Sequence, residues 1–245
     1  NVLDGVNHNT VFMVWNFKGN VEIKEAFKNV CKLVINLNHS ANTRFPETKA
    51  SVVMGIGFHA WNLKKKKKPL PKEFEEFQEI VGSKHTAVST KGDLHFHIRG
   101  NYKSFCMDTA TAITDALREV ADCVEEIHGF KYWDGRSIIG FVDGTENPYG
   151  EDRAYFGIIG DEDLEYKGCS YLFVQKYMHD LHAWRNLPVY EQEKVVGRSK
   201  YEDIEMADDV KPTNSHSAVA HVGDDANIVR DNMPFGNIST NDMGT

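Results

Sequence analysis

The sequence predicts an α+β protein made of two ferredoxin-like units, each with the order β-α-β-β-α-β and an antiparallel sheet. Short apolar runs typical of buried strands alternate with longer segments in which apolar residues recur every three or four positions, as on one face of a helix. The length of 245 residues suits one large domain or two small ones, and 41% hydrophobic with 26% charged residues is ordinary for a soluble globular protein.

The first half of the chain contains six predicted elements, which complete one ferredoxin-like unit. The first helix is predicted from the helical spacing of Phe27, Val30 and Val34. The second is predicted from a longer apolar stripe that runs from Ile113 to Ile127. In chain order, the elements are a strand at residues 11–17, a helix at 22–37, strands at 51–58 and 93–99, a helix at 104–127 and a strand at 130–133.

The strand at residues 93–99 alternates strictly, with apolar residues on one face and His95 and His97 on the other. This pattern predicts a half-buried strand whose histidines lie on the polar face. Two other histidines, His179 and His182, are three positions apart at a predicted helix start. Either pair could contribute to a metal site, but nothing nearby completes one, so alternation and a helix-terminus role are the simpler interpretations.

The second half begins like a second unit, with a strand at residues 169–178, a helix at 188–198 and a strand at 228–233. The chain ends before the elements that would complete that unit, so we expect the second unit to be truncated at its C-terminus. The predicted domains are therefore residues 1–136, the first ferredoxin-like unit, and residues 137–245, a linker loop and an incomplete second unit.

Charge and cysteine content argue against several classes of protein. A net charge of −8 disfavours binding to nucleic acid or to an anionic membrane surface. The four cysteines, Cys31, Cys106, Cys123 and Cys169, form no C-x-x-C pair, which indicates reduced thiols in a cytoplasmic protein rather than a zinc site or disulfides. Five consecutive lysines at residues 64–68 predict a solvated loop, with a basic docking patch as the alternative.

The most informative motif is the segment at residues 140–148, Gly-Phe-Val-Asp-Gly-Thr-Glu-Asn-Pro. An apolar run ends in Asp143, which lies between Gly140 and Gly144, and an Asn-Pro turn follows. Glycine permits a bulky partner to approach the backbone closely. The motif therefore predicts either a carboxylate fixed beside such a partner or an ordinary Asx turn in a surface loop.

This motif resembles the G-x-x-D-G signature of the dye-decolorizing peroxidases, a family of haem enzymes. Three later blocks resemble the same family in order and approximate spacing: Gly-Arg-Ser-Lys at residues 197–200, Asn-Ser-His at 214–216, and Ile-Val-Arg-Asp-Asn-Met-Pro-Phe-Gly at 228–236. The resemblance extends over essentially the whole chain and implies two ferredoxin-like domains with haem b as the cofactor.

The resemblance also implies roles for individual residues. His216 takes the position of the axial ligand to the haem iron, with His221 as the alternative, because a neutral imidazole is a common donor to haem iron. Asp143 takes the position of the proton shuttle for peroxide, acting first as general base and then as general acid. Arg230 matches an arginine that stabilises the departing oxygen, and Asn232 matches an amide that can hydrogen-bond peroxide.

Four further residues are expected to bind the cofactor. Arg198 is a candidate partner for a haem propionate, because a guanidinium binds carboxylate through two parallel hydrogen bonds. Val142, Gly144 and Thr145 flank Asp143 and are expected to contact the haem. Without the family resemblance, Arg230 would be assigned to a surface ion pair with a neighbouring acid.

The leading functional hypothesis is a haem peroxidase that reduces hydrogen peroxide and oxidises small aromatic donors such as dyes and phenols. Aspartate is usually a weaker base than histidine, so we expect an activity optimum in acid. One alternative is a haem-handling protein for storage, transfer or iron release, with incidental peroxidase activity. Another is a haem-free ligand-binding or structural module. We expect no nucleic-acid or membrane partner, and a homo-oligomer is compatible with the sequence.

Overall fold

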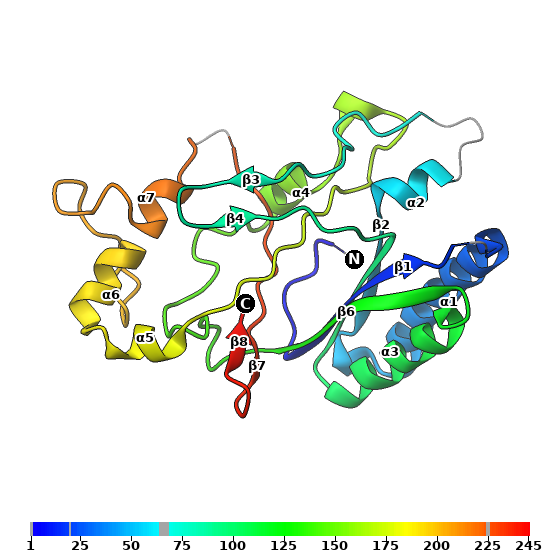
Figure 1. Ribbon diagram of the computed structural model, residues 1–245, viewed down its shortest axis with the longest axis horizontal. Helices are drawn as coiled ribbons and strands as arrows, with labels where there is room; N and C mark the ends of the chain where they lie inside the picture. Colours follow the sequence, from blue (N-terminus) through cyan, green and yellow to red (C-terminus); the bar gives the residue numbers. More distant parts are fainter. Residues whose placement is uncertain (1, 20, 64–68, 224–225) are drawn as a thin grey trace. The chain divides into compact units, whose positions relative to one another are not determined.

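The computed structural model describes residues 2–19, 21–63, 69–223 and 226–245, so the predicted lysine loop at residues 64–68 lies outside the described residues. The chain divides into two compact units (Figure 1). Unit 1 is formed mainly by Asn7–His128 with Ile159–Leu172, and unit 2 mainly by Gly129–Ile158 with Phe173–Thr245. Within the described ranges, no helix is long and apolar enough to cross a membrane.

Unit 1 has the predicted ferredoxin-like topology. Its main elements are β1 (Asn9–Phe17), α1 (Ile23–Arg44), β2 (Ser51–Ile56), β5 (Leu94–Gly100), α3 (Lys103–Leu117) and β6 (Ala121–Phe130). The strands lie in the order β2-β5-β1-β6, and β5 is antiparallel to both β1 and β2. Smaller elements of unit 1 are the 3₁₀ turns at Pro46–Thr48 and Asp161–Asp163, α2 (Phe58–Leu63) and the hairpin of β3 (Ile80–Val81) and β4 (Thr86–Ala87).

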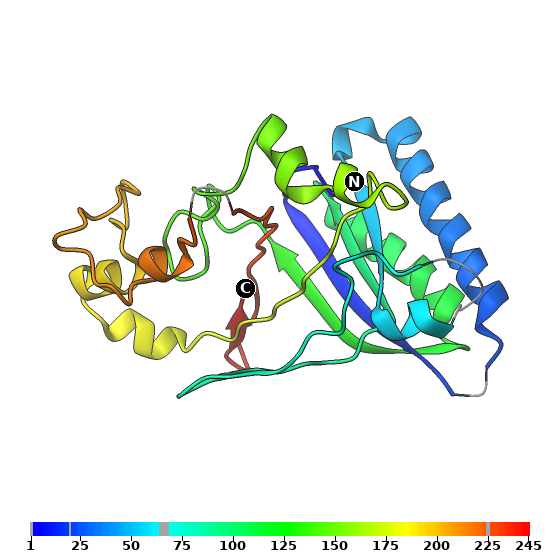
Figure 2. The same ribbon diagram turned by 90° about the horizontal axis from the view of Figure 1, so that it is seen from above.

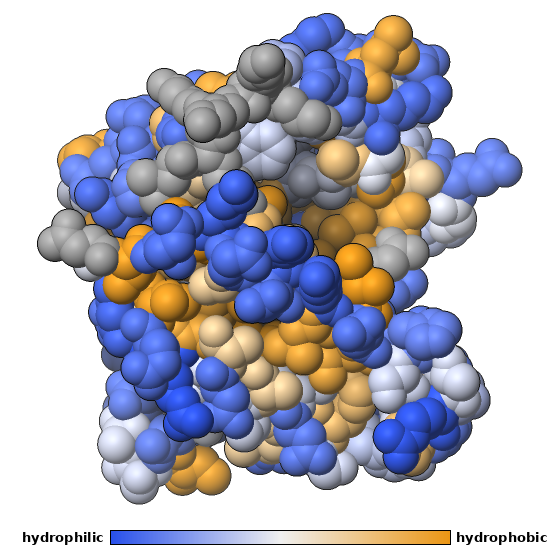
Figure 3. Space-filling model, turned by 90° about the vertical axis from the view of Figure 1, so that its right-hand side faces the viewer, coloured by the Kyte–Doolittle hydropathy of each residue, from blue (hydrophilic) through white to orange (hydrophobic). Residues whose placement is uncertain are grey.

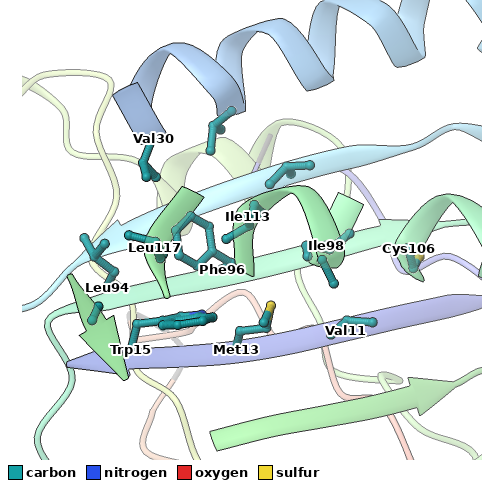
Figure 4. Packing of buried hydrophobic residues seen from close by; sticks show 14 of the residues in the cluster. Val11, Met13, Trp15, Val30, Leu94, Phe96, Ile98, Cys106, Ile113 and Leu117 are labelled. Atoms are coloured by element: carbon teal, nitrogen blue, oxygen red, sulfur yellow. The ribbon is translucent and has the colours of Figure 1, made fainter. Parts of the chain in front are cut away.

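The core of unit 1 lies between its sheet and its two long helices, which occupy the same side of the sheet (Figure 2). Alternate residues of β1 and β5 point into this layer, among them Trp15 and Phe96, and they meet Val30 of α1 and Ile113 of α3 (Figure 4). Each such side chain contributes about 1.5–3 kcal/mol when it is removed from water.

The outer surface of α1 is polar, as its helical periodicity predicts. Its buried residues are Phe27, Val30, Val34 and Ala41, at steps that keep them on one face. Figure 3 views the molecule from the side where α1 lies in Figure 1, and there hydrophilic residues are interspersed with hydrophobic ones.

The predicted helix at residues 104–127 is wrong in its second half. The helix ends with α3, and the following residues form β6. A turn closed by the hydrogen bond from Val120 N to Leu117 O (2.8 Å) redirects the chain, and Val120 O then accepts from Lys18 N (2.9 Å). The apolar spacing suited a helix, but the β-branched and strand-forming residues after Leu117 are stabilised by pairing in the sheet, which overrides the helical pattern.

Three of the predicted strands are also wrong. At residues 130–133, the chain leaves β6 and Trp133 adopts a left-handed φ of 48°. Residues 169–178 form no strand, since only Met178 makes an isolated bridge, to Gly244. Residues 228–233 likewise form no ladder. A strand needs a neighbour as well as the right side chains. Within the described residues, the segment at residues 169–178 exchanges two backbone hydrogen bonds with another segment only near its end, between Tyr177 and Thr245.

Unit 2 is built from short elements. They are α4 (Glu151–Gly157), α5 (Leu181–Asn186), α6 (Val189–Val196), α7 (His216–Ala220) and the antiparallel pair β7 (Phe235–Asn237) and β8 (Asp242–Gly244). The predicted helix at residues 188–198 corresponds to α6, which begins after Pro188 and ends at Gly197 in the left-handed conformation. Long connecting loops join these elements, and the candidate site is made from those loops.

The face of β5 predicted to be polar is buried. His95 and His97 are 9% and 8% exposed, and the Phe12 ring stacks on His97 with 4.5 Å between ring centroids. Neither ring nitrogen of His95 has a hydrogen-bond partner among the described residues. Burial disfavours the charged imidazole and lowers the pKa of His95 from 6.5 to about 4. Burial, with a smaller effect of the Arg99 charge, also lowers the pKa of His97.

The burial of His95 predicts that unit 1 loses stability in acid. The unfolded chain binds a proton at this histidine below pH 6.5, whereas the folded chain does so only near pH 4, so stability falls across that window by up to about 3 kcal/mol. His95→Leu should remove the part of this loss that His95 contributes and leave the part due to His97, whose pKa burial also lowers, as measured by hydrogen exchange of the β5 amides at pH 7 and pH 4.5. His39→Leu, at an exposed position on α1, is the control and should keep the wild-type loss. An equal loss in wild type and His95→Leu would contradict the assignment.

Candidate active site

The loop that carries Asp143 is held by backbone hydrogen bonds. Asp143 N donates to Gly135 O (3.2 Å), and Asn147 N donates to Gly144 O (3.0 Å). Gly140 and Gly144 have φ of 94° and 82°, in the left-handed region that glycine adopts without strain. The loop therefore presents a half-buried Asp143 on a defined turn.

Arg136 joins this loop to the segment that follows α6. Its Nη1 donates to Gly140 O (3.1 Å) and to Lys200 O (2.7 Å), while its Nε lies 3.2 Å from the Asp134 carboxylate. One guanidinium thus satisfies carbonyls from two chain segments that lack regular structure. Arg136 was not among the predicted site residues.

The structure brings two predicted catalytic residues into direct contact. Asn232 Nδ2 donates to Asp143 Oδ1 at 2.9 Å, although the residues are 89 positions apart. Asp143 Oδ2 accepts no hydrogen bond from the described part of the chain. One carboxylate oxygen is therefore held in place while the other remains available to a ligand.

Arg230 is held in position through its backbone by Asn147. Arg230 N donates to Asn147 Oδ1 (3.0 Å), and Asn147 Nδ2 donates to Arg230 O (2.7 Å). The side-chain amide thereby supplies both partners that a neighbouring strand would otherwise provide. Asn147 belongs to the Asp143 loop, so the same loop orients both Asp143 and Arg230.

The guanidinium of Arg230 is buried at Nε, which has no hydrogen-bond partner among the described residues. Arg230 also forms no ion pair within the described ranges, and the neighbouring Asp231 pairs with Arg153 at 3.0 Å. Among the described residues, Arg230 is therefore not held by a surface ion pair. A buried donor without a partner is unusual in native proteins, and at a site it is a candidate contact for a ligand.

Arg198 is engaged by protein carboxylates. Its Nε lies 2.8 Å from Asp203 Oδ1, and its Nη1 lies 3.4 Å from both Glu146 and Glu205. Thr145 donates its hydroxyl to the same Asp203 carboxylate. These contacts tie the Asp143 loop to residues 198–205. The predicted propionate contact of Arg198 stays a prediction, and a propionate would have to share the guanidinium with these acids.

His216 is the first residue of α7, and its imidazole is exposed. Ser215 caps this short helix by accepting a hydrogen bond from Ala218 N (3.4 Å). Gly197 has φ of 87°, and a Cβ there would lie 2.1 Å from Ser217 Oγ, so a glycine is needed where α6 meets α7. His216 makes no hydrogen bond or ion pair with the described residues and is not joined by one to Asp143 or Arg230.

The two histidine pairs considered as metal ligands, His95 with His97 and His179 with His182, do not form a metal site among the described residues. Among the described residues, no group of three or more His, Cys, Asp or Glu side chains could hold a metal ion. His95 and His97 are buried in β5, and burial lowers the pKa of His179. Such a metal ion would need several protein ligands, whereas haem iron needs only one from the protein, because the porphyrin supplies the rest.

Comparison with known proteins identifies the family. A model described as "Dyp-type peroxidase, N-terminal" matches residues 2–131, and one described as "Dyp-type peroxidase, C-terminal" matches residues 134–245. The chain belongs to the DyP-type peroxidase family. It is therefore a haem peroxidase, an oxidoreductase that reduces hydrogen peroxide and oxidises aromatic donors, and the haem-handling alternative is not favoured.

Individual relatives support the same conclusion. The dye-decolorizing peroxidase of Rhodococcus erythropolis is 44% identical over 240 residues, which are 96% of this chain and 69% of that protein. That of Mycobacterium tuberculosis is 41% identical over 231 residues, 93% of this chain and 68% of that protein.

Solved structures confirm the fold of this DyP-type peroxidase. A dye-decolorizing peroxidase from Bacteroides thetaiotaomicron matches with a TM-score of 0.96 and 45% identity, over 100% of this chain and 80% of that one. The encapsulated DyP-type peroxidase from Mycobacterium smegmatis matches with a TM-score of 0.92 and 39% identity, over 99% and 79%. A variant of Rhodococcus jostii DypB in complex with heme matches with a TM-score of 0.90 and 36% identity, over 99% and 79%.

The residues present in unit 2 fit haem. The orphaned Nε of Arg230 offers a buried donor for a bound group, and the His216 imidazole is available as a donor to iron. The contacts of Asn147, Arg136 and Gly197 were not predicted, because each depends on a residue at least 20 positions away in the sequence. The only sequence signal for Asn147 was its position in the motif at residues 140–148, where it was interpreted as part of an Asn-Pro turn.

The two hydrogen bonds of Asn147 predict a graded mutational effect. Asn147→Ala loses both bonds to Arg230 and should destabilise unit 2 by about 1–3 kcal/mol and lower kcat/KM for peroxide. Asn147→Asp keeps the acceptor for Arg230 N, so its stability and its kcat/KM for peroxide should lie between those of the wild type and of Asn147→Ala. Urea unfolding and peroxide titration measure the two effects.

The matched control is Asn227→Ala, since Asn227 is exposed and its side chain makes, within the described ranges, only a local bond, from Ile228 N (2.8 Å), and a long 3.5 Å contact with Glu146 O. It should change the free energy of unfolding by less than about 0.5 kcal/mol. Equal effects of Asn147→Ala and Asn227→Ala would show that the Asn147 contacts do not hold Arg230.

Proposed function

We propose that Asp143, Arg230 and Asn232 form the peroxide-binding part of the haem site, and that His216 would hold the haem iron. The observation that carries this proposal is the joint support of Asp143 and Arg230 by one loop, with Asn232 bonded to Asp143 at 2.9 Å. Bound haem supplies the iron that accepts electrons from the aromatic donors and passes them to peroxide. The protein supplies orientation, proton transfer and charge stabilisation.

Asp143 moves the proton of hydrogen peroxide. Its Oδ2 takes the proton from one peroxide oxygen and returns it to the other, so that water can leave. Asn232 keeps Oδ1 in place, which restricts rotation of the carboxylate and directs Oδ2 toward the peroxide.

Arg230 stabilises the negative charge that develops on the departing oxygen. A fixed guanidinium is more effective than a mobile one, because it need not reorganise as the bond breaks. The Asn147 contacts fix the backbone of Arg230, and the absence of an ion pair with the described residues leaves its charge available.

The remaining family-implied residues complete the proposal. His216 would hold the iron through an imidazole nitrogen, with His221 as the alternative ligand. Val142, Gly144 and Thr145 would lie against the haem face beside Asp143, where Gly144 adds no side-chain bulk. Arg198 would contact a propionate while it keeps its bond to Asp203.

We also propose a location and an assembly state for the protein. We assign the protein to the cytoplasm from its free cysteines, and the described residues contain none in a disulfide. The Mycobacterium smegmatis relative is an encapsulated DyP-type peroxidase, which supports a homo-oligomeric assembly for this chain. Gel filtration with light scattering tests the assembly directly.

Variants of Asp143 and Arg230 test the catalytic assignments. Asp143→Ala should lower kcat/KM for peroxide by about 10²–10⁴-fold, because it removes the proton shuttle. Arg230→Lys should lower it less than Arg230→Ala, because the charge is kept while the planar guanidinium is lost. Variants at both positions should still bind haem and keep its absorption band. Glu151→Gln, at an exposed position on α4, is the control and should keep wild-type turnover.

Replacement of His216 separates the cofactor ligand from the catalytic groups. His216→Ala should abolish or strongly shift the haem absorption band on titration with hemin, and added imidazole should restore part of it. His221→Ala, five residues along the chain, should bind hemin as the wild type does. The reverse pattern would assign the iron to His221.

A further inference from the structure

The helix α4 contacts the chain on both sides of Arg230, within unit 2. A Cβ at Gly157 would lie 3.0 Å from Val229 Cγ2, so the helix approaches Val229 this closely only because residue 157 has no side chain. One helical turn earlier, Arg153 Nη2 lies 3.0 Å from Asp231 Oδ1. The residues before and after Arg230 therefore both rest on one face of α4.

Arg153 is fixed by two further contacts besides its ion pair. Its Nε donates to Leu3 O (2.8 Å), and its Nη2 donates to Asp4 O (3.0 Å) as well as to the Asp231 carboxylate. A guanidinium presents its donors in a rigid planar fork, so several acceptors together fix its orientation. Arg153 therefore joins α4 and residues 3–4 to the segment that carries Arg230.

The Arg153–Asp231 ion pair is largely shielded from water. Its side chains are 14% and 17% exposed, whereas those of the Arg118–Asp115 pair in unit 1 are 62% and 55% exposed. Exposed pairs are screened by water and contribute little, but removal of one partner from a shielded pair leaves the other charge uncompensated. Without Arg153, the Asp231 carboxylate would therefore attract another cation, and the cation next to it in the sequence is Arg230.

We propose that Arg153 is a positioning residue for the reaction with peroxide, because it binds Asp231 and thereby keeps the guanidinium of Arg230 available to the departing oxygen. Asn147 holds the backbone of Arg230, and Arg153 binds the carboxylate that would compete for its charge. An ion pair between Asp231 and Arg230 would neutralise the charge that stabilises the departing oxygen. This inference rests on the proposed role of Arg230, through which Arg153 acts.

The direct test compares two substitutions of Arg153 in the haem-loaded full chain. Arg153→Gln removes the positive charge and should lower kcat/KM for hydrogen peroxide by about 10–100-fold, the effect expected when a group at the reacting centre is misplaced. Arg153→Lys keeps a cation for Asp231 and should retain most of the wild-type value. Peroxide and the aromatic donor react in separate steps, so kcat/KM for a phenol should stay at the wild-type level in both variants.

The comparison of the two substrates separates positioning from a loss of folded enzyme. Partial unfolding of Arg153→Gln would lower kcat/KM for peroxide and for the phenol by the same factor. Arg118→Gln is the matched control, because it breaks the exposed Arg118–Asp115 pair in unit 1, and it should keep both wild-type values. An equal loss for the two substrates in Arg153→Gln, or the same kcat/KM for peroxide in Arg153→Gln and in the control, would overturn the proposal.

A second substitution tests whether the charge of Asp231 causes the loss. Asp231→Asn, introduced together with Arg153→Gln, removes the carboxylate that Arg153→Gln leaves uncompensated. The double variant should therefore recover part of the kcat/KM for peroxide that Arg153→Gln alone loses. A double variant with the same or a lower value than Arg153→Gln would show that competition from Asp231 is not the cause, and would overturn the proposal.

Arg230→Ala distinguishes this inference from the proposed catalytic role of Arg230. Because Arg153 acts through Arg230, Arg153→Gln should cause little further loss in a chain that already carries Arg230→Ala, and a full further loss would overturn the proposal. If Arg230→Ala loses peroxide turnover and Arg153→Gln does not, the role of Arg153 fails while that of Arg230 stands. If Arg230→Ala keeps wild-type turnover, the catalytic role of Arg230 fails and this inference fails with it.

Discussion

The candidate site depends on contact between two loops that are far apart in the sequence. Asn147 binds both backbone groups of Arg230, and Asn232 binds Asp143, over separations of 83 and 89 residues. Neither segment belongs to a helix or to a sheet ladder there. Side-chain amides are suited to this arrangement, because one amide both donates and accepts and can replace the pair of bonds that a strand would make.

Charged groups around these loops extend the support. Arg136 binds carbonyls of the Asp143 loop and of Lys200, and Arg198 binds Asp203 and approaches Glu146. Hydrogen bonds to ionised groups are stronger than those between neutral groups. Bonds from the guanidinium groups can therefore hold these loops in place without a helix or a sheet. Arg136 and Arg198 each bind protein acceptors through several of their donors, whereas Arg230 keeps a buried donor without a partner among the described residues. That difference distinguishes Arg230 from the two arginines that hold the loop.

The sequence predicted unit 1 well because its signals are local. Alternation in β5 and helical spacing in α1 were sufficient, while the helix at residues 104–127 failed because one apolar stripe suited both a helix and the strand β6. Strands at residues 169–178 and 228–233 failed because pairing depends on a neighbour that local pattern cannot supply. Asp143 and Asn232 were predicted as site residues from the family resemblance, but the contacts of Asn147 depend on the distant backbone of Arg230 and were not predicted.

The unpartnered donor of Arg230 indicates how unit 2 is stabilised. A buried polar group without a partner costs about 1–3 kcal/mol, so unit 2 tolerates this cost only where other contacts offset it. The amide and guanidinium bonds of Asn147 and Arg136 offer that compensation locally. A ligand that accepts a hydrogen bond from Arg230 binds the folded state and not the unfolded chain. Its binding therefore raises the free energy of unfolding. The same donor makes the site selective for a polar ligand, since an apolar group would leave Arg230 Nε unsatisfied.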